Sequence, residues 1–214
     1  MSLWKSITTL LLSFMFFSFQ PVFAIMPPTK TTILVWGDSL SAAYGIPVEK
    51  GWVNLLQEKL GENFVVANAS ISGETTSGGL NRLGESLPAI KPHYVIIELG
   101  ANDGLQGKST KEMHDNLEQM IKLALDAPAK VILIGIHLPP NYGASYNEKF
   151  DQVYKDLAEK YQLTFIPFLL DGIATDFSLM QADGLHPTAE AQPKILENLW
   201  PVLEPVLVDV VGQR

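Results

Sequence analysis

The chain has 214 residues, a formal net charge of −8 at neutral pH and no cysteine. An acidic chain without a basic run lacks the positive charge that holds nucleic acids, so we expect no nucleic-acid partner. The missing cysteines exclude a thiol nucleophile, a thiolate metal site and a lipidated N-terminal cysteine.

The beginning of the chain has the pattern of a secretory signal peptide. Lys5 is the only charged residue before an apolar run at positions 10–19, and a small-residue cleavage site ends at Ala24. The alternative is a membrane anchor, but the run is shorter than the ~20 residues that a spanning helix needs. We therefore expect residues 1–24 to be cleaved and residues 25–214 to form one domain. The product would be exported, either periplasmic or fully secreted, without a stable membrane anchor.

Five short apolar runs are predicted to be strands. They are mostly continuous and rich in β-branched residues, which is typical of a sheet buried on both faces. The runs lie at positions 32–36, 64–67, 94–99, 131–136 and 163–166.

Apolar residues at helical spacing lie between and after these runs. They predict helices at positions 52–60, 113–124 and 146–161, and a last helix from 187 to 200. Capping boxes are predicted at two of the starts, Ser109 with Glu112 and Ser145 with Glu148. Pro187 suits the first turn of the last helix, and Pro201 is expected to break or kink it.

The alternation of strands and helices predicts a three-layer α/β/α domain with a central, mainly parallel five-stranded sheet. Such sheets bind ligands at the carboxyl ends of their strands. Four polar segments follow predicted strands: Gly-Asp-Ser-Leu at 37–40, Ser-Ile-Ser-Gly at 70–73, Gly-Ala-Asn-Asp at 100–103 and Asp-Gly-Leu-His-Pro at 183–187. We expect all four to meet at one edge.

These segments contain the parts of a serine hydrolase. A serine hydroxyl needs a base to take its proton, and a carboxylate can hold that base in the correct tautomer. Ser39, His186 and Asp183 fit these three roles. The developing oxyanion needs preplaced donors, for which the Ser39 and Gly73 backbone N–H groups and the Asn102 amide are candidates. Other acidic residues, such as Asp38 and Glu98, are interpreted as structural.

The four blocks resemble those of the GDSL/SGNH hydrolases, and most closely the branch of exported bacterial thioesterases and lysophospholipases. The similarity extends from about Ile33 to beyond Gln192. It implies a flavodoxin-like SGNH fold that hydrolyses acyl esters and thioesters with no cofactor or metal. It also implies that Ser39, Asp183 and His186 are catalytic, and that Ser39, Gly73 and Asn102 form the oxyanion hole. His137 stands where a longer polar side chain is common.

Two other functions remain open: a deacetylase for carbohydrates or small esters, and a non-catalytic binding module on a flavodoxin-like sheet. The loops after the strands are apolar, and Leu105, Leu138 and Tyr142 are candidates for a groove that binds an acyl chain. His137 could line the same cleft. We expect a small-molecule acyl ester or thioester as substrate and a monomeric protein, although the sequence does not determine the oligomeric state.

Overall fold

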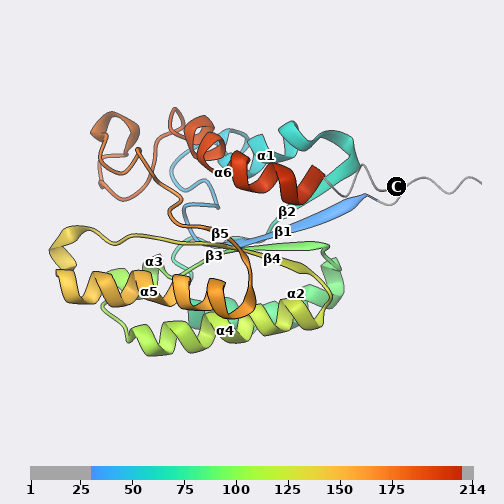
Figure 1. Ribbon diagram of the computed structural model, residues 1–214. Helices are drawn as coiled ribbons and strands as arrows, with labels where there is room; N and C mark the ends of the chain where they lie inside the picture. Colours follow the sequence, from blue (N-terminus) through green and yellow to red (C-terminus); the bar gives the residue numbers. More distant parts are fainter. Residues whose placement is uncertain (1–29, 209–214) are drawn as a thin grey trace, which may run out of the picture.

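A central sheet of five parallel strands organises the protein (Figure 1). The computed structural model describes residues 30–208, so the predicted signal peptide lies outside the described residues. The strands are β1 (Thr31–Gly37), β2 (Phe64–Asn68), β3 (Tyr94–Glu98), β4 (Lys130–Ile134) and β5 (Thr164–Ile166). Their order, β2-β1-β3-β4-β5, is that of flavodoxin-like sheets, in which ligands bind where β1 and β3 diverge.

Helices cover both faces of this sheet. Figure 1 shows α1 and α6 on one face, and α2, α4 and α5 on the other. The α-helices are α1 (Trp52–Leu60), α2 (Thr76–Ile90), α3 (Ala101–Leu105), α4 (Thr110–Asp126), α5 (Ala144–Tyr161) and α6 (Gln192–Val208). The predicted three-layer α/β fold is thereby confirmed.

The middle strands are mostly apolar because each face of the sheet has its own core. In β1, Ile33 and Val35 pack into the core on the side of α1 and α6. Their neighbours Leu34 and Trp36 pack into the core on the side of α2, α4 and α5. Successive side chains of a strand point to opposite faces, so burial of both faces requires a continuous apolar run.

The sequence analysis missed α2, whose sequence contains three glycines and Pro88. Its buried residues include Gly79, Leu83 and Leu87, at helical spacing. At Gly79 a side chain would collide with Leu99, so glycine lets this helix approach the sheet closely. Glycine and proline are poor helix formers, and here packing against the core overrides their propensity.

Of the two predicted capping boxes, one has its N-cap residue in place and the other is wrong. Ser109 caps α4 by accepting a hydrogen bond from the Glu112 N–H, at 3.4 Å. The predicted box of Ser145 and Glu148 is wrong, because α5 begins one residue before Ser145 and its N-cap is Gly143. Gly143 has φ +93°, a conformation that suits glycine and turns the chain into the helix.

The last helix begins at Gln192 and not at Pro187. Pro187 is extended instead, in an antiparallel bridge with Met180. Pro201 does not end α6, which continues through it to Val208. Leu203 and Leu207 beyond this proline are fully buried, so their packing outweighs the lost backbone hydrogen bond.

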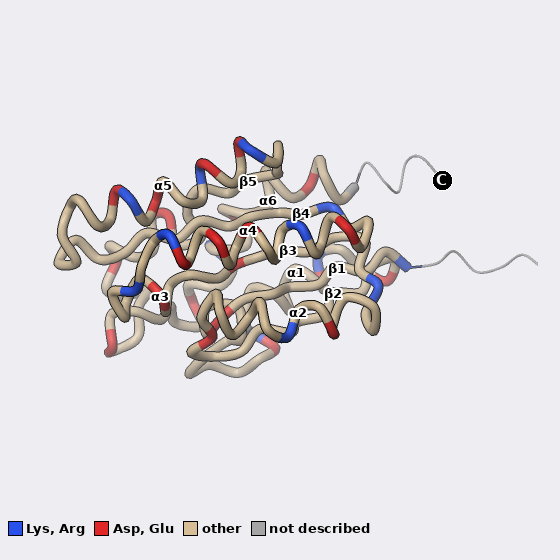
Figure 2. The backbone as a smooth tube through the Cα atoms, turned by 90° about the horizontal axis from the view of Figure 1, so that it is seen from below, with Lys and Arg blue, Asp and Glu red and all other residues tan. Residues whose placement is uncertain are grey.

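The outer surface of α4 and α5 is charged with both signs. Figure 2 shows acidic and basic residues alternating along these helices. Lys111 pairs with Asp115 at 2.6 Å within α4, and Lys160 of α5 pairs with Glu118 of α4. Over residues 30–208, each helix is too short or too polar to cross a membrane.

Candidate active site

Ser39, His186 and Asp183 lie in one hydrogen-bonded row at the carboxyl edge of the sheet. Ser39 is in the turn after β1, and its Oγ lies 2.8 Å from His186 Nε2. The other ring nitrogen, Nδ1, lies 2.7 Å from Asp183 Oδ2. Ser39 and His186 are 147 positions apart in the sequence, and the fold brings them together. This is the geometry that a nucleophile, a base and an orienting carboxylate require.

The loop holding Asp183 fixes that carboxylate and keeps it ionised. Its Oδ1 accepts hydrogen bonds from the backbone N–H of Leu185 at 2.9 Å and of His186 at 3.0 Å. Desolvation alone would raise the pKa of Asp183. The hydrogen bonds from His186 and Leu185 outweigh it and lower the pKa to about 2. At neutral pH the charge is therefore available to stabilise an imidazolium on His186.

Asn102 lies beside the triad in the first turn of α3, with its amide held in place. Its Nδ2 donates to Asp38 Oδ2 at 3.1 Å and to the Glu74 backbone oxygen at 2.9 Å. These two acceptors fix the plane of the amide. Because both hydrogens of Nδ2 already have an acceptor, an oxyanion bound beside Asn102 would share one of these hydrogens. Gly73, the third candidate donor, is one residue before Glu74 and has φ +80°, which favours glycine.

Two buried carboxyl groups support the turn that contains Ser39. Asp38 Oδ1 accepts the Leu40 N–H at 3.0 Å, and Glu98 Oε2 accepts the Ser41 hydroxyl at 2.6 Å. Burial raises the pKa of both groups. Repulsion from Asp103 and Glu74 adds to the shift of Asp38, and repulsion from Asp38 adds to that of Glu98. The residue directly before Asp38 is Gly37, and a side chain at this position would press against the Glu98 carboxyl group.

Asp103 is a structural residue that the sequence analysis did not identify. It is buried, and its two carboxylate oxygens accept from the backbone N–H and the hydroxyl of Thr76, both at 2.8 Å. Thr76 opens α2 directly after the segment that contains Gly73. Asp103 therefore ties the Gly73 segment to the helix that holds Asn102. The long-range partner, 27 positions away, leaves no local signal in the sequence.

An apolar pocket of about 460 Å³ opens beside Ser39 and His186. Leu105 and Leu138, two of the candidate groove residues, line it. Tyr142 does not: its hydroxyl donates to the Leu105 backbone oxygen at 3.0 Å, so it supports the wall from outside. The opposite wall follows β5 and was not predicted, although the apolar run after that strand gave a signal. It consists of Phe168, Leu169, Leu170, Ala174 and Thr175.

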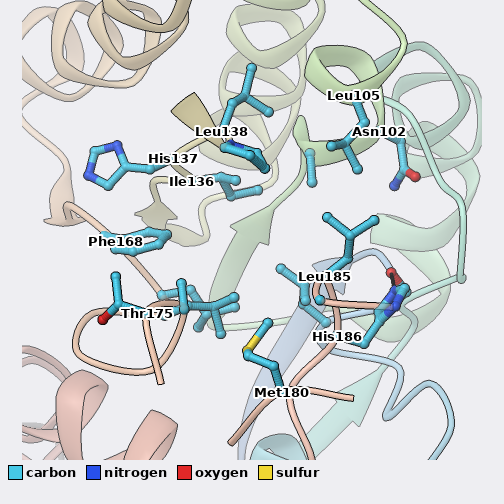
Figure 3. A pocket seen from close by; sticks show the side chains of 18 of the residues that line it. Asn102, Leu105, Ile136, His137, Leu138, Phe168, Thr175, Met180, Leu185 and His186 are labelled. Atoms are coloured by element: carbon cyan, nitrogen blue, oxygen red, sulfur yellow. Dashed lines mark hydrogen bonds between the residues drawn. The ribbon is translucent and has the colours of Figure 1, made fainter. Parts of the chain in front are cut away.

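His137 lies at the end of this pocket that is far from the triad. Figure 3 shows His137 and Phe168 together at one end, with Asn102 and His186 at the other. The His137 and Phe168 rings are 4.4 Å apart between centroids, and His137 Nδ1 is 2.9 Å from Asp151 Oδ1. Leu138, Leu185 and Met180 lie between the two ends (Figure 3). In the described part of the chain, no three His, Asp or Glu side chains are grouped to hold a metal ion.

Known proteins are similar to this chain in sequence and in fold. Residues 35–192 match the GDSL-like Lipase/Acylhydrolase family. Esterase TesA of Pseudomonas aeruginosa is 49% identical over 179 residues, which cover 82% of this chain and 89% of the relative. Thioesterase 1/protease 1/lysophospholipase L1 of Escherichia coli K12 is 37% identical over 191 residues, covering 89% of this chain and 92% of the relative.

Solved structures agree with these matches. The crystal structure of TesA superposes with a TM-score of 0.81 and covers 83% of this chain and 100% of its own. The psychrotrophic esterase EstA of Pseudoalteromonas, in a structure inhibited by monoethylphosphonate, gives a TM-score of 0.79 at 42% identity, covering 83% of this chain and 99% of its own. The chain therefore belongs to the GDSL-like lipase/acylhydrolase family, a group of serine hydrolases that act on ester bonds.

Proposed function

We propose that this protein hydrolyses acyl esters and acyl thioesters through a covalent acyl-enzyme formed on Ser39. The observation that carries the proposal is the unbroken row from Ser39 Oγ to His186 Nε2 and from His186 Nδ1 to Asp183 Oδ2, at 2.8 and 2.7 Å. A hydroxyl in this setting can lose its proton as it attacks a carbonyl carbon.

In this mechanism His186 acts twice. It takes the Ser39 proton as the Ser39 oxygen attacks, and then gives that proton to the departing alcohol or thiol. In the second half of the reaction the same base takes a proton from water as the water attacks the acyl-enzyme, and returns that proton to Ser39 Oγ as the acid leaves. Ionised Asp183 stabilises the imidazolium in both steps. Ser39, Gly73 and Asn102 supply the hydrogen bonds to the oxyanion in each tetrahedral intermediate.

Removal of the Asn102 amide tests the oxyanion part of this mechanism. We expect Asn102→Ala to lower kcat by about 10²–10³ with little change in KM, because the oxyanion exists only along the reaction path. Steady-state kinetics on one ester measures both constants. A raised KM at unchanged kcat would instead make Asn102 a residue that binds the ground state. Thermal unfolding serves as the control, because the same change removes the bonds to Asp38 and Glu74.

The proposed substrates are medium to long acyl chains, because the pocket beside Ser39 is lined mainly by apolar residues. Relatives named esterase, arylesterase and thioesterase support ester and thioester chemistry. The acyl chain would run from Ser39 between Leu138 and Met180 towards Phe168 and His137 (Figure 3). The leaving group would remain on the solvent side of Ser39.

A chain-length series tests this assignment. Each buried CH₂ contributes about 0.8 kcal/mol, so a few methylenes should raise kcat/KM by one or two orders of magnitude before the pocket is full. Leu138→Ala should reduce this gain, because Leu138 is buried in the pocket wall. Leu125→Ala, an exposed position on α4, is the matched control and should leave the series unchanged. A flat series, or a preference for acetyl esters, would favour the deacetylase alternative.

Export is part of the same proposal and rests on the sequence alone. The charged start, the apolar run and the site after Ala24 favour cleavage of residues 1–24 and activity in the periplasm or outside the cell. The measurement for this point is N-terminal sequencing of the exported protein.

A further inference from the structure

The nucleophile and its base are on segments that meet only after folding. Ser39 is in the turn after β1, whereas His186 is in the long loop between β5 and α6. Catalysis requires these segments to stay aligned to a fraction of an ångström. Contacts that join the two segments outside the triad are therefore candidates for controlling the reaction.

Gln181 provides such a contact. Its side-chain Nε2 donates to the Tyr44 backbone oxygen at 2.8 Å and to the Pro187 backbone oxygen at 3.0 Å. Tyr44 belongs to the Ser39 turn, since its N–H donates to the Ser39 oxygen, and Pro187 directly follows His186. One amide thus bridges the two segments close to the Ser39–His186 hydrogen bond.

The main chain of Gln181 is also part of the His186 loop. Its N–H donates to the His186 oxygen at 2.7 Å, and its carbonyl accepts the Gly184 N–H at 2.9 Å. The loop from Gln181 to His186 is thereby closed on itself and can move as one unit. The side chain of Gln181 then fixes this unit to the Ser39 turn.

The neighbouring residues fit this arrangement. Gly45 has φ +74°, and a side chain there would collide with the Gln181 carboxamide. The Tyr44 ring packs against the His186 ring, with centroids 4.5 Å apart. The turn after Ser39 therefore has a glycine next to the Gln181 side chain and an aromatic ring packed against His186.

We propose that Gln181 is a positioning residue, which holds the Asp183–His186 loop against the Ser39 turn so that Nε2 stays aligned with Oγ. The proposal rests on the proposed function, because it assigns Gln181 a role only if Ser39 and His186 react. Gln181 itself touches neither the substrate nor the reacting atoms.

Gln181→Met tests the proposal, because methionine fills similar space without a donor. We expect kcat to fall about 10- to 100-fold, since misplacement by about 1 Å can cost 10²-fold, while KM stays within twofold. The reaction of Ser39 with a fluorophosphonate should slow by the same factor. Gln181→Glu is the second variant: its ionised side chain cannot donate to two carbonyl oxygens, so an equal or larger fall is expected.

Gln57→Met is the matched control. The Gln57 amide also donates to two backbone oxygens, those of Gly61 and Phe64, but it joins α1 to β2. This variant should lose similar stability and keep its kcat. If kcat falls as much in Gln57→Met as in Gln181→Met, the cause is a general loss of stability and the proposal fails.

The proton resonance of the His186 Nδ1–H separates positioning from local unfolding. Because the Asp183–His186 bond lies within the loop, this downfield signal should persist in Gln181→Met. Its loss, or wild-type kcat in both Gln181 variants, would overturn the proposal. Ser39→Ala measured alongside tests the proposed function separately: activity in that variant would refute the triad, whereas an inactive Ser39→Ala beside a normal Gln181→Met would refute only the role of Gln181.

Discussion

Ser39→Ala is expected to lower kcat by about 10⁶, the size of effect seen when a serine nucleophile is removed from a triad. Alanine leaves His186 without the oxygen that it must deprotonate, and no acyl-enzyme can form. KM should change little, because the pocket walls that hold the acyl chain are untouched. Steady-state kinetics on a chromogenic ester measures the effect, with a purification that excludes contaminating esterases.

The fold should survive this change. Ser39 is only partly buried, and the turn around it is held by Asp38, Ser41 and Glu98. Thermal unfolding of Ser39→Ala should therefore match that of the wild type to within a few degrees. A correctly folded Ser39→Ala protein with near-normal turnover would refute the mechanism.

Asp183→Asn is expected to lower kcat by about 10⁴. The substitution keeps the shape of the side chain but removes the charge that stabilises the imidazolium of His186. An amide that donates to Nδ1 would also favour the wrong tautomer and place a proton on the nitrogen that faces Ser39. The loss should appear in kcat for esters and thioesters alike, because both pass through the same protonated base.

A second aspartate in the same loop provides the control. Asp176 Oδ1 accepts the N–H of Ser178 two residues later, at 3.0 Å, as Asp183 Oδ1 does from Leu185. It does not contact His186, so Asp176→Asn should leave kcat unchanged. Similar losses in the two variants would indicate that the carboxylates act through the shape of the loop, and would contradict a specific role for Asp183.

The sequence predicted the sheet and the site blocks because their signals are local. A strand buried on both faces is a continuous apolar run. Three of the four motif blocks follow such a run closely, and the fourth ends the long loop after β5. The order β2-β1-β3-β4-β5 then brings the blocks that follow β1 and β3 next to each other, which is why Ser39 and Asn102 line the same pocket. In a parallel sheet the carboxyl ends of the strands lie at one edge, so segments that are separate in the sequence can form one site.

The errors came from residues whose role depends on distant partners. Gly79 looks like a helix breaker until its close packing against Leu99 is known. Pro187 looks like a helix start, although its bridge to Met180 keeps it extended. Tyr142 is aromatic and close in sequence to Leu138, yet its hydroxyl donates to the Leu105 backbone oxygen and its side chain does not line the pocket.

The sequence analysis also missed residues that support the site, because their partners are distant in the sequence. Asp103 and Gln181 form hydrogen bonds to segments 27 and 137 positions away. Periodicity and motif spacing do not report such bonds. The pocket wall after β5 was missed because its residues face Leu138 only once β4 and β5 have paired.

The most direct test of the proposed function is to identify the residue that a fluorophosphonate labels. The reagent phosphonylates a serine only where a base and an oxyanion hole activate it, so it reports the assembled site and not a motif. Wild-type protein should take up one label per chain, on Ser39, as activity falls in proportion, and Ser39→Ala should take up none. Loss of activity with the label on another residue, or full activity with Ser39 labelled, would contradict the proposal.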